Sequence, residues 1–203
     1  MLSIFQTQKF TLLNLAIIVI YASCLLQTSP LSAEGKKIQF SLTNHHGESV
    51  TEKDFLGSWL LVFFGYSHCP DICPMNLSII SDTLERLGAE GAKVQPLFIT
   101  LDPARDTEAK LLRFLSHFHE RLLGLTGTQK QIQTVAESFF VRYKVSTEKD
   151  RDYYLIDHTA ATYLVDDSGQ GLAIFQHNTT SAEIASTINR YISLLYTSPS
   201  QRD

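Results

Sequence analysis

The stretch "SWLLVFFGYSHCPDICPMNLSIISDTLERLG", residues 58–88, predicts a buried strand, a short loop and a helix in direct succession. Its first part is a continuous apolar run of strand length, which is typical of a central strand buried on both faces. After the loop, four apolar residues recur at helical spacing and a glycine then ends the pattern: Leu77, Ile80, Leu84, Leu87 and Gly88. We therefore expect an α/β domain whose central strand delivers the loop to the end of a sheet, where open sheets bind ligands.

The rest of the domain alternates the same two patterns. Strands are expected at residues 38–42, 94–102, 161–166 and 172–176, a short segment at 122–127, and helices at 106–119, 128–143 and 181–195. Asp106 is the expected N-cap of the helix at 106–119. This order resembles that of a thioredoxin-like domain, with a central mixed sheet flanked by helices and a late hairpin, around "DSGQG", at the sheet edge.

Composition limits the class of protein. The chain has 203 residues, of which 44% are hydrophobic and 19% charged, and this is enough for one ordinary hydrophobic core. The net charge of -4 and the lack of a concentrated Lys/Arg cluster argue against nucleic-acid binding, which needs a basic footprint. Nothing in the sequence demands more than a monomer.

The N-terminal segment differs from the remainder. Residues 1–33 contain Lys9 as their only charged side chain and an apolar stretch at about residues 10–26. We predict a signal peptide or an N-terminal membrane anchor at 1–33, ahead of a domain at 34–203. Ala33 ends a candidate cleavage site, and lipidation at Cys24 is an alternative. The domain is then membrane-anchored or secreted and faces the periplasm.

Cys69 and Cys73 are the two cysteines left to the domain. They could form a structural disulfide, a redox-active pair or part of a metal site. A disulfide that closes so short a loop would constrain the unfolded chain little. Both thiols lie near the expected start of a helix, whose dipole favours the thiolate needed for metal ligation and for disulfide exchange alike. The cysteines by themselves leave the last two alternatives open.

His158 provides the discriminating feature. Thioredoxin-like oxidoreductases place a cis-proline beside their cysteines, just before a strand that corresponds here to residues 161–166. This sequence has no proline between Pro103 and Pro199, and "DHTA" places His158 at that point instead. Two thiolates and an imidazole form a soft set suited to Cu(I), and to Cu(II) if an oxygen ligand joins.

Nearby residues offer further donors. Zinc would need a fourth protein ligand in a structural site, and His68 is the candidate for it. Asp71 and Asp157 flank the expected ligands and could donate oxygen or orient His158. The remaining histidine pairs, His45 with His46 and His117 with His119, are expected at the surface.

Four motifs in order, "GYSHCPDICP", "LDPARDT", "GLTGT" and "DHTAATYLVDDSG", resemble the SCO/SenC family over about residues 38–195. The resemblance implies a thioredoxin-like, usually membrane-tethered protein that binds one copper ion through Cys69, Cys73 and His158. It also implies a role in maturing the dicopper centre of cytochrome c oxidase, by copper delivery or cysteine reduction. The expected partners are the copper-bearing subunit of the oxidase and other copper chaperones. A thiol-disulfide oxidoreductase, in which copper binding is incidental, is the alternative.

Overall fold

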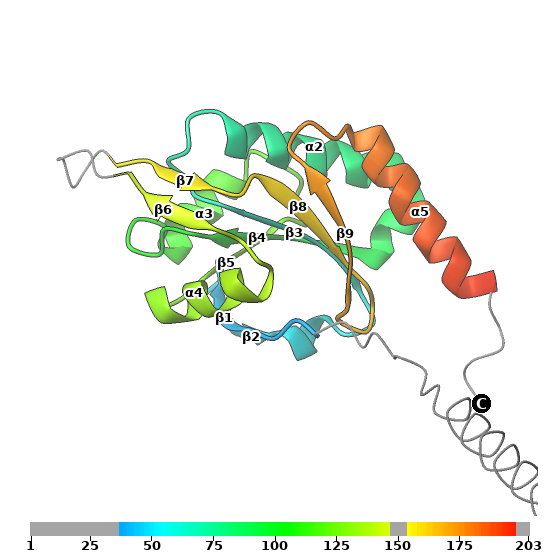
Figure 1. The fold of residues 1–203 in the computed structure, drawn as a ribbon, viewed down its shortest axis with the longest axis horizontal. Coiled ribbons are helices and arrows are strands. Elements are labelled where there is room, and N and C mark those ends of the chain that lie inside the picture. Colours follow the sequence, from blue (N-terminus) through cyan, green and yellow to red (C-terminus); the bar gives the residue numbers. More distant parts are fainter. Residues whose placement is uncertain (1–36, 147–153, 198–203) are drawn as a thin grey trace, which may run out of the picture. The chain divides into compact units, whose positions relative to one another are not determined.

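A computed structural model describes residues 37–146 and 154–197 (Figure 1). The predicted leader at 1–33, its cleavage site and Cys24 lie outside the described residues. Within the described ranges, no helix is both long and apolar enough to cross a membrane.

The main sheet has seven strands in the order β2-β1-β5-β4-β3-β8-β9. These strands are β1 Ser41–Asn44, β2 Ser49–Thr51, β3 Trp59–Gly65, β4 Val94–Thr100, β5 Leu123–Thr126, β8 Ala161–Val165 and β9 Gly171–Gln176. Strand β4 runs parallel to β3 and β5, whereas the other neighbouring strands are antiparallel. The sheet is therefore mixed, as predicted, and the β8–β9 hairpin lies at its edge.

Helices cover both faces of this sheet. They are α2 Ile72–Leu87, α3 Glu108–Leu115, α4 Gln129–Ser138 and α5 Ser181–Thr197, with the short 3-10 turns η1 Glu52–Phe55 and η2 Gly88–Lys93. Alternate side chains of β3 point to opposite faces. Leu61 and Phe63 belong to the core formed with α2, α3 and α5, whereas Val62 and Phe64 belong to the core formed with α4. This two-sided burial explains the continuous apolar run of β3.

The end of β3 sets the position of the cysteine loop. Strands β3 and β4 are in parallel register, with Gly65 opposite Thr100, so both strands end at the same edge of the sheet. The chain then crosses a short loop and enters α2 at Ile72. At the other end of α2, Gly88 has a positive φ of 54° and ends the helix, as the sequence predicts.

A small ribbon outside the main sheet was not expected. Strand β6, Tyr143–Val145, pairs antiparallel with β7, Ile156–His158. The helix predicted at 128–143 ends instead at Ser138, and Phe140 takes a left-handed φ of 56°. The chain thus leaves α4 early, and β7 carries His158 to the edge where β3 ends.

Two sequence predictions were wrong in detail. The helix predicted at 106–119 is α3, which begins at Glu108 with Thr107 in the N-cap position, while Asp106 is fully buried. His45 is also buried, and its Nδ1 accepts a 2.9 Å hydrogen bond from the backbone N–H of Gly124. It is a core histidine that joins the β1–β2 turn to β5.

Candidate metal centre

The structure brings Cys69, Cys73 and His158 together in one group, which we call the Cys–Cys–His cluster. Their ligand atoms all lie within 4.8 Å of one another, and Cys73 Sγ lies 3.6 Å from His158 Nε2. Both cysteines are free thiols in this structure. The three donors are thus close enough to bind a single ion.

The two cysteines differ in their surroundings. Cys73 is in the first turn of α2 and is fully buried in the core, whereas Cys69 lies in the preceding loop and is partly exposed. Cys69 is therefore the cysteine that an incoming ligand or thiol can reach.

The thiols of Cys69 and Cys73 have pKa values shifted in opposite directions. A hydrogen bond from Cys73, assisted by His158 and by the backbone N–H groups of Asp71 and Cys73, holds the pKa of Cys69 far below its usual value. The same hydrogen bond, together with burial, raises the pKa of Cys73. The reduced cluster therefore has a thiolate at Cys69 and a thiol at Cys73. A metal ion bound by both sulfurs must displace the remaining proton.

His158 is oriented by a contact with the backbone of the next residue. Its Nδ1 lies 3.0 Å from the carbonyl oxygen of Thr159, to which the Nδ1–H group donates. This contact fixes the orientation of the ring, so that Nε2 faces the sulfur of Cys73. The ring packs edge-on against Tyr66 and Phe63, at centroid distances of 6.0 and 6.3 Å.

The other donors proposed from sequence are not part of the cluster. His68 interacts with Lys110 Nζ at 3.0 Å and with Ser67 Oγ at 3.2 Å. Asp71 occupies the N-cap position of α2 and is exposed, without a side-chain capping hydrogen bond. Asp157 is exposed, and as the neighbour of His158 in a strand it points to the opposite face. Three protein donors remain.

Asp106 organises the start of the cysteine loop. Its carboxylate accepts hydrogen bonds from the backbone N–H of Ser67 at 2.9 Å, from the Ser67 hydroxyl, and from Thr100 Oγ1 at 2.6 Å. The loop after β3 is thereby fixed to the end of β4. Sequence reasoning missed this role because the "RDT" pattern is also that of a helix cap.

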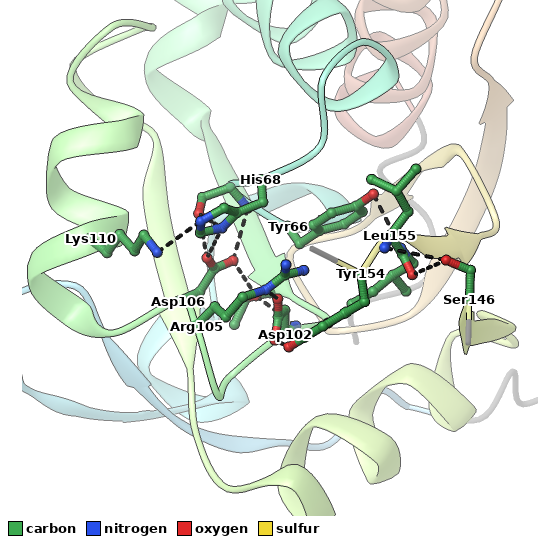
Figure 2. Close-up of polar contacts among 12 residues, drawn as sticks. Tyr66, His68, Asp102, Arg105, Asp106, Lys110, Ser146, Tyr154 and Leu155 are labelled. Carbon is green, nitrogen blue, oxygen red and sulfur yellow. Dashed lines mark hydrogen bonds and ion pairs between the residues drawn. The ribbon is translucent and has the colours of Figure 1, made fainter. Parts of the chain in front are cut away.

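A second set of contacts positions β7 (Figure 2). Arg105 pairs with Asp102 and lies over the ring of Tyr154, 3.5 Å from its centroid, while the Tyr154 hydroxyl donates to Asp102 at 2.6 Å. The backbone N–H of Ile156 donates to the Tyr66 hydroxyl at 3.2 Å. These contacts hold the first residues of β7, and hence His158, against the edge where β3 and β4 end.

Gly65 provides the space for the buried sulfur. A Cβ atom at this position would lie 2.8 Å from Cys73 Sγ and 3.0 Å from the ring of Phe98. Both distances are shorter than ordinary van der Waals contact, so the close approach of strand and sulfur requires glycine.

Comparisons with known proteins identify the family of the chain. The model of the SCO1/SenC family matches residues 29–193. The mitochondrial SCO1 homolog of Mus musculus is 41% identical over 151 residues, which are 73% of this chain and 53% of the mouse protein. The chain thus spans about half the length of the curated relatives it matches.

Copper-bound structures of relatives share the fold. ScoI of Bradyrhizobium japonicum with copper bound is 41% identical, with a TM-score of 0.71 over 76% of this chain and 98% of that chain. Yeast Sco1 with copper bound is 34% identical, with a TM-score of 0.71 over 81% and 91% of the two chains. The predicted thioredoxin-like fold is confirmed, and the chain belongs to the SCO1/SenC family.

Proposed function

We propose that this protein binds one copper ion through Cys69, Cys73 and His158 and assists maturation of the dicopper centre of cytochrome c oxidase. The observation that supports this most strongly is the Cys–Cys–His cluster itself, whose donor atoms lie within 4.8 Å of one another in a chain of the SCO1/SenC family. Relatives such as ScoI of Bradyrhizobium japonicum and yeast Sco1 have been solved with copper bound.

The donor set favours copper over zinc. Two sulfurs and an imidazole nitrogen satisfy the preference of Cu(I) for few, soft ligands, and Cu(II) could add an oxygen ligand at the exposed side of Cys69. A structural zinc site usually has four protein ligands. The cluster has three, since His68 is hydrogen-bonded elsewhere.

Cysteine reduction is the second candidate activity, and the asymmetry of the two thiols favours it. The low pKa of the partly exposed Cys69 makes it a nucleophile towards a disulfide of a partner. Cys73 can then attack the mixed disulfide, which releases the reduced partner and leaves a Cys69–Cys73 disulfide. Copper binding and this disulfide exclude one another, because each requires both sulfurs.

The cellular setting belongs to the same proposal. The apolar leader supports a domain, residues 34–203, that is anchored or exported by residues 1–33 and faces the periplasm. Its partners are the copper-bearing subunit of the oxidase and other copper chaperones. The protein acts as a monomer.

The test is a Cu(I) titration of the reduced full chain, in a nonionic detergent, against a competing chelator. We expect one tightly bound copper, and a loss of affinity of at least about 100-fold in Cys69→Ser, Cys73→Ser and His158→Ala. His68→Ala is the matched control and should stay near wild type. Copper binding that is weak and indifferent to His158 would refute the ligand assignment and favour the oxidoreductase alternative.

A further inference from the structure

A basic pocket opens beside the Cys–Cys–His cluster. It has a volume of about 300 Å³ and is lined by Ser67, His68, Lys110, Arg113, Phe114 and His117. One wall is the cysteine loop, because His68 directly precedes Cys69 in the chain. The opposite wall is formed by α3, where Lys110, Arg113 and Phe114 share a face at helical spacing.

The charge of this pocket is opposite to that of the whole chain. The protein has a net charge of -4 with its histidines counted as neutral, yet the lining contains a lysine and an arginine and no acidic residue. Glu108 lies two residues before Lys110 on α3, and residues so spaced do not share a helix face. A cleft with walls of one sign focuses the field on ligands of the opposite sign.

The two permanent cations of the pocket are not neutralised by the protein. Lys110 Nζ lies 3.0 Å from His68 Nε2 (Figure 2), so its closest polar partner is an imidazole and not a carboxylate. Among residues 37–146 and 154–197, neither Lys110 nor Arg113 has a carboxylate oxygen within 4.0 Å. Both can therefore pair with carboxylates from outside.

The acidic residues behind the pocket are already engaged. Asp106 is fully buried and accepts hydrogen bonds from Ser67 and Thr100, although one of its oxygens lies 3.9 Å from His68 Nδ1. Asp102 pairs with Arg105. The carboxylates thus stabilise the loop from the inside, whereas Lys110 and Arg113 face the pocket.

We propose that the basic pocket docks an acidic protein surface, with carboxylates of the partner against Lys110 and Arg113 and an apolar contact on Phe114. Docking at this wall places the partner beside Cys69, which is partly exposed. The inference rests on the proposed function for the identity of that partner, the copper-bearing domain of the oxidase. The recognition chemistry itself follows from the pocket.

The first test does not depend on the oxidase. A fluorescein-labelled peptide rich in glutamate is titrated with the reduced full chain in nonionic detergent at low salt, and binding is followed by fluorescence anisotropy. We expect the double variant Lys110→Glu/Arg113→Glu to weaken binding at least about tenfold and to flatten its salt dependence. The control Lys130→Glu/Arg190→Glu makes the same change in net charge at exposed positions of α4 and α5. Equal weakening in both double variants, or none in either, would overturn the proposal.

The second test uses the copper-bearing domain of the oxidase and measures its association rate with the same variants. We expect the rate to fall at least about tenfold in Lys110→Glu/Arg113→Glu, while the Cu(I) affinity of that variant stays at the wild-type value. An unchanged rate would refute docking at this pocket and leave the proposed function intact. A wild-type chain that binds the acidic peptide here but not the oxidase domain would refute the proposed partner and leave the docking surface intact.

Discussion

Replacing Gly65 by alanine should perturb the copper site without removing any ligand. The added Cβ would lie 2.8 Å from Cys73 Sγ, about 0.6 Å inside the 3.4 Å at which ordinary contact begins. It would also lie 3.0 Å from the ring of Phe98 and 3.1 Å from that of Phe63, so the neighbouring side chains leave little room for adjustment. The sulfur of Cys73 must therefore move, and α2 is expected to shift with it.

Two magnitudes follow from this displacement. Overpacking of a well-packed core costs about 1–3 kcal/mol, which lowers the Tm of a domain of this size by at least about 2 °C. Ligand positions need to be held to about 0.5 Å for tight binding, so a shift of this size should lower the Cu(I) affinity at least about tenfold. Stability and copper affinity should therefore both fall. His158→Ala, by contrast, removes a partly exposed ligand and should lower mainly the copper affinity.

The assay combines thermal unfolding of the reduced full chain with Cu(I) competition against a chelator. Gly171→Ala is the matched control, because a Cβ at Gly171, in the edge strand β9, meets no atom within 4 Å. We expect the control to match wild type in both measurements. A Gly65→Ala variant with unchanged Tm and copper affinity would show that Cys73 Sγ is not packed against β3 as described.

Three further predictions concern the loop and its thiols. Asp106→Asn replaces one of the carboxylate oxygens that accept hydrogen bonds from Ser67 and Thr100 by a donor. We expect the free energy of unfolding in urea to fall by about 1–3 kcal/mol and the copper–thiolate absorption band to change. A variant with normal stability and spectrum would contradict the role of Asp106 in organising the loop. Iodoacetamide should modify Cys69 before the buried Cys73. Because the pKa of Cys69 is lowered far below neutrality, the rate of its alkylation should change less than about twofold between pH 6 and 8. Over the same range, alkylation of an ordinary thiol of pKa about 8.5 becomes more than tenfold faster. The rate is measured by mass spectrometry of the modified peptides. A rate that rises with pH as for an ordinary thiol would refute the lowered pKa of Cys69. Oxidation to the Cys69–Cys73 disulfide should abolish Cu(I) binding until a reductant is added, and undiminished affinity of the oxidised protein in the chelator assay would exclude ligation by both sulfurs.

The sheet could be predicted from sequence because its signals are local. The apolar run of β3 and the helical spacing of α2 each lie within one segment, and both elements form where expected, with Gly88 ending the helix. The ribbon of β6 and β7 could not be predicted in this way. Each of its strands has three residues, and its position depends on contacts with distant segments, such as that between Tyr66 and Ile156.

The Cys–Cys–His cluster could be predicted from sequence for a different reason. Cys69 and Cys73 share a loop, and His158 was linked to them by the expected position of a strand and by a family resemblance, not by spacing. The roles of Asp106 and Gly65 could not be predicted from the sequence. A buried carboxylate and a helix cap look alike in sequence, and the need for glycine at Gly65 becomes visible only when Cys73 Sγ is placed beside it.

Under the proposed function, the unequal burial of the two cysteines predicts that copper transfer and cysteine reduction both begin at Cys69. In both reactions the partner would approach Cys69, since Cys69 is partly exposed whereas Cys73 is fully buried. Cys69→Ser should therefore abolish both activities and cannot distinguish them.

His158 contributes a ligand to copper but no atom to the exchange of disulfides. His158→Ala should thus abolish tight Cu(I) binding while reduction of a model disulfide continues within about threefold of the wild-type rate. Equal loss of the two activities would mean that the imidazole also serves the thiol chemistry, through the hydrogen bond by which it lowers the pKa of Cys69.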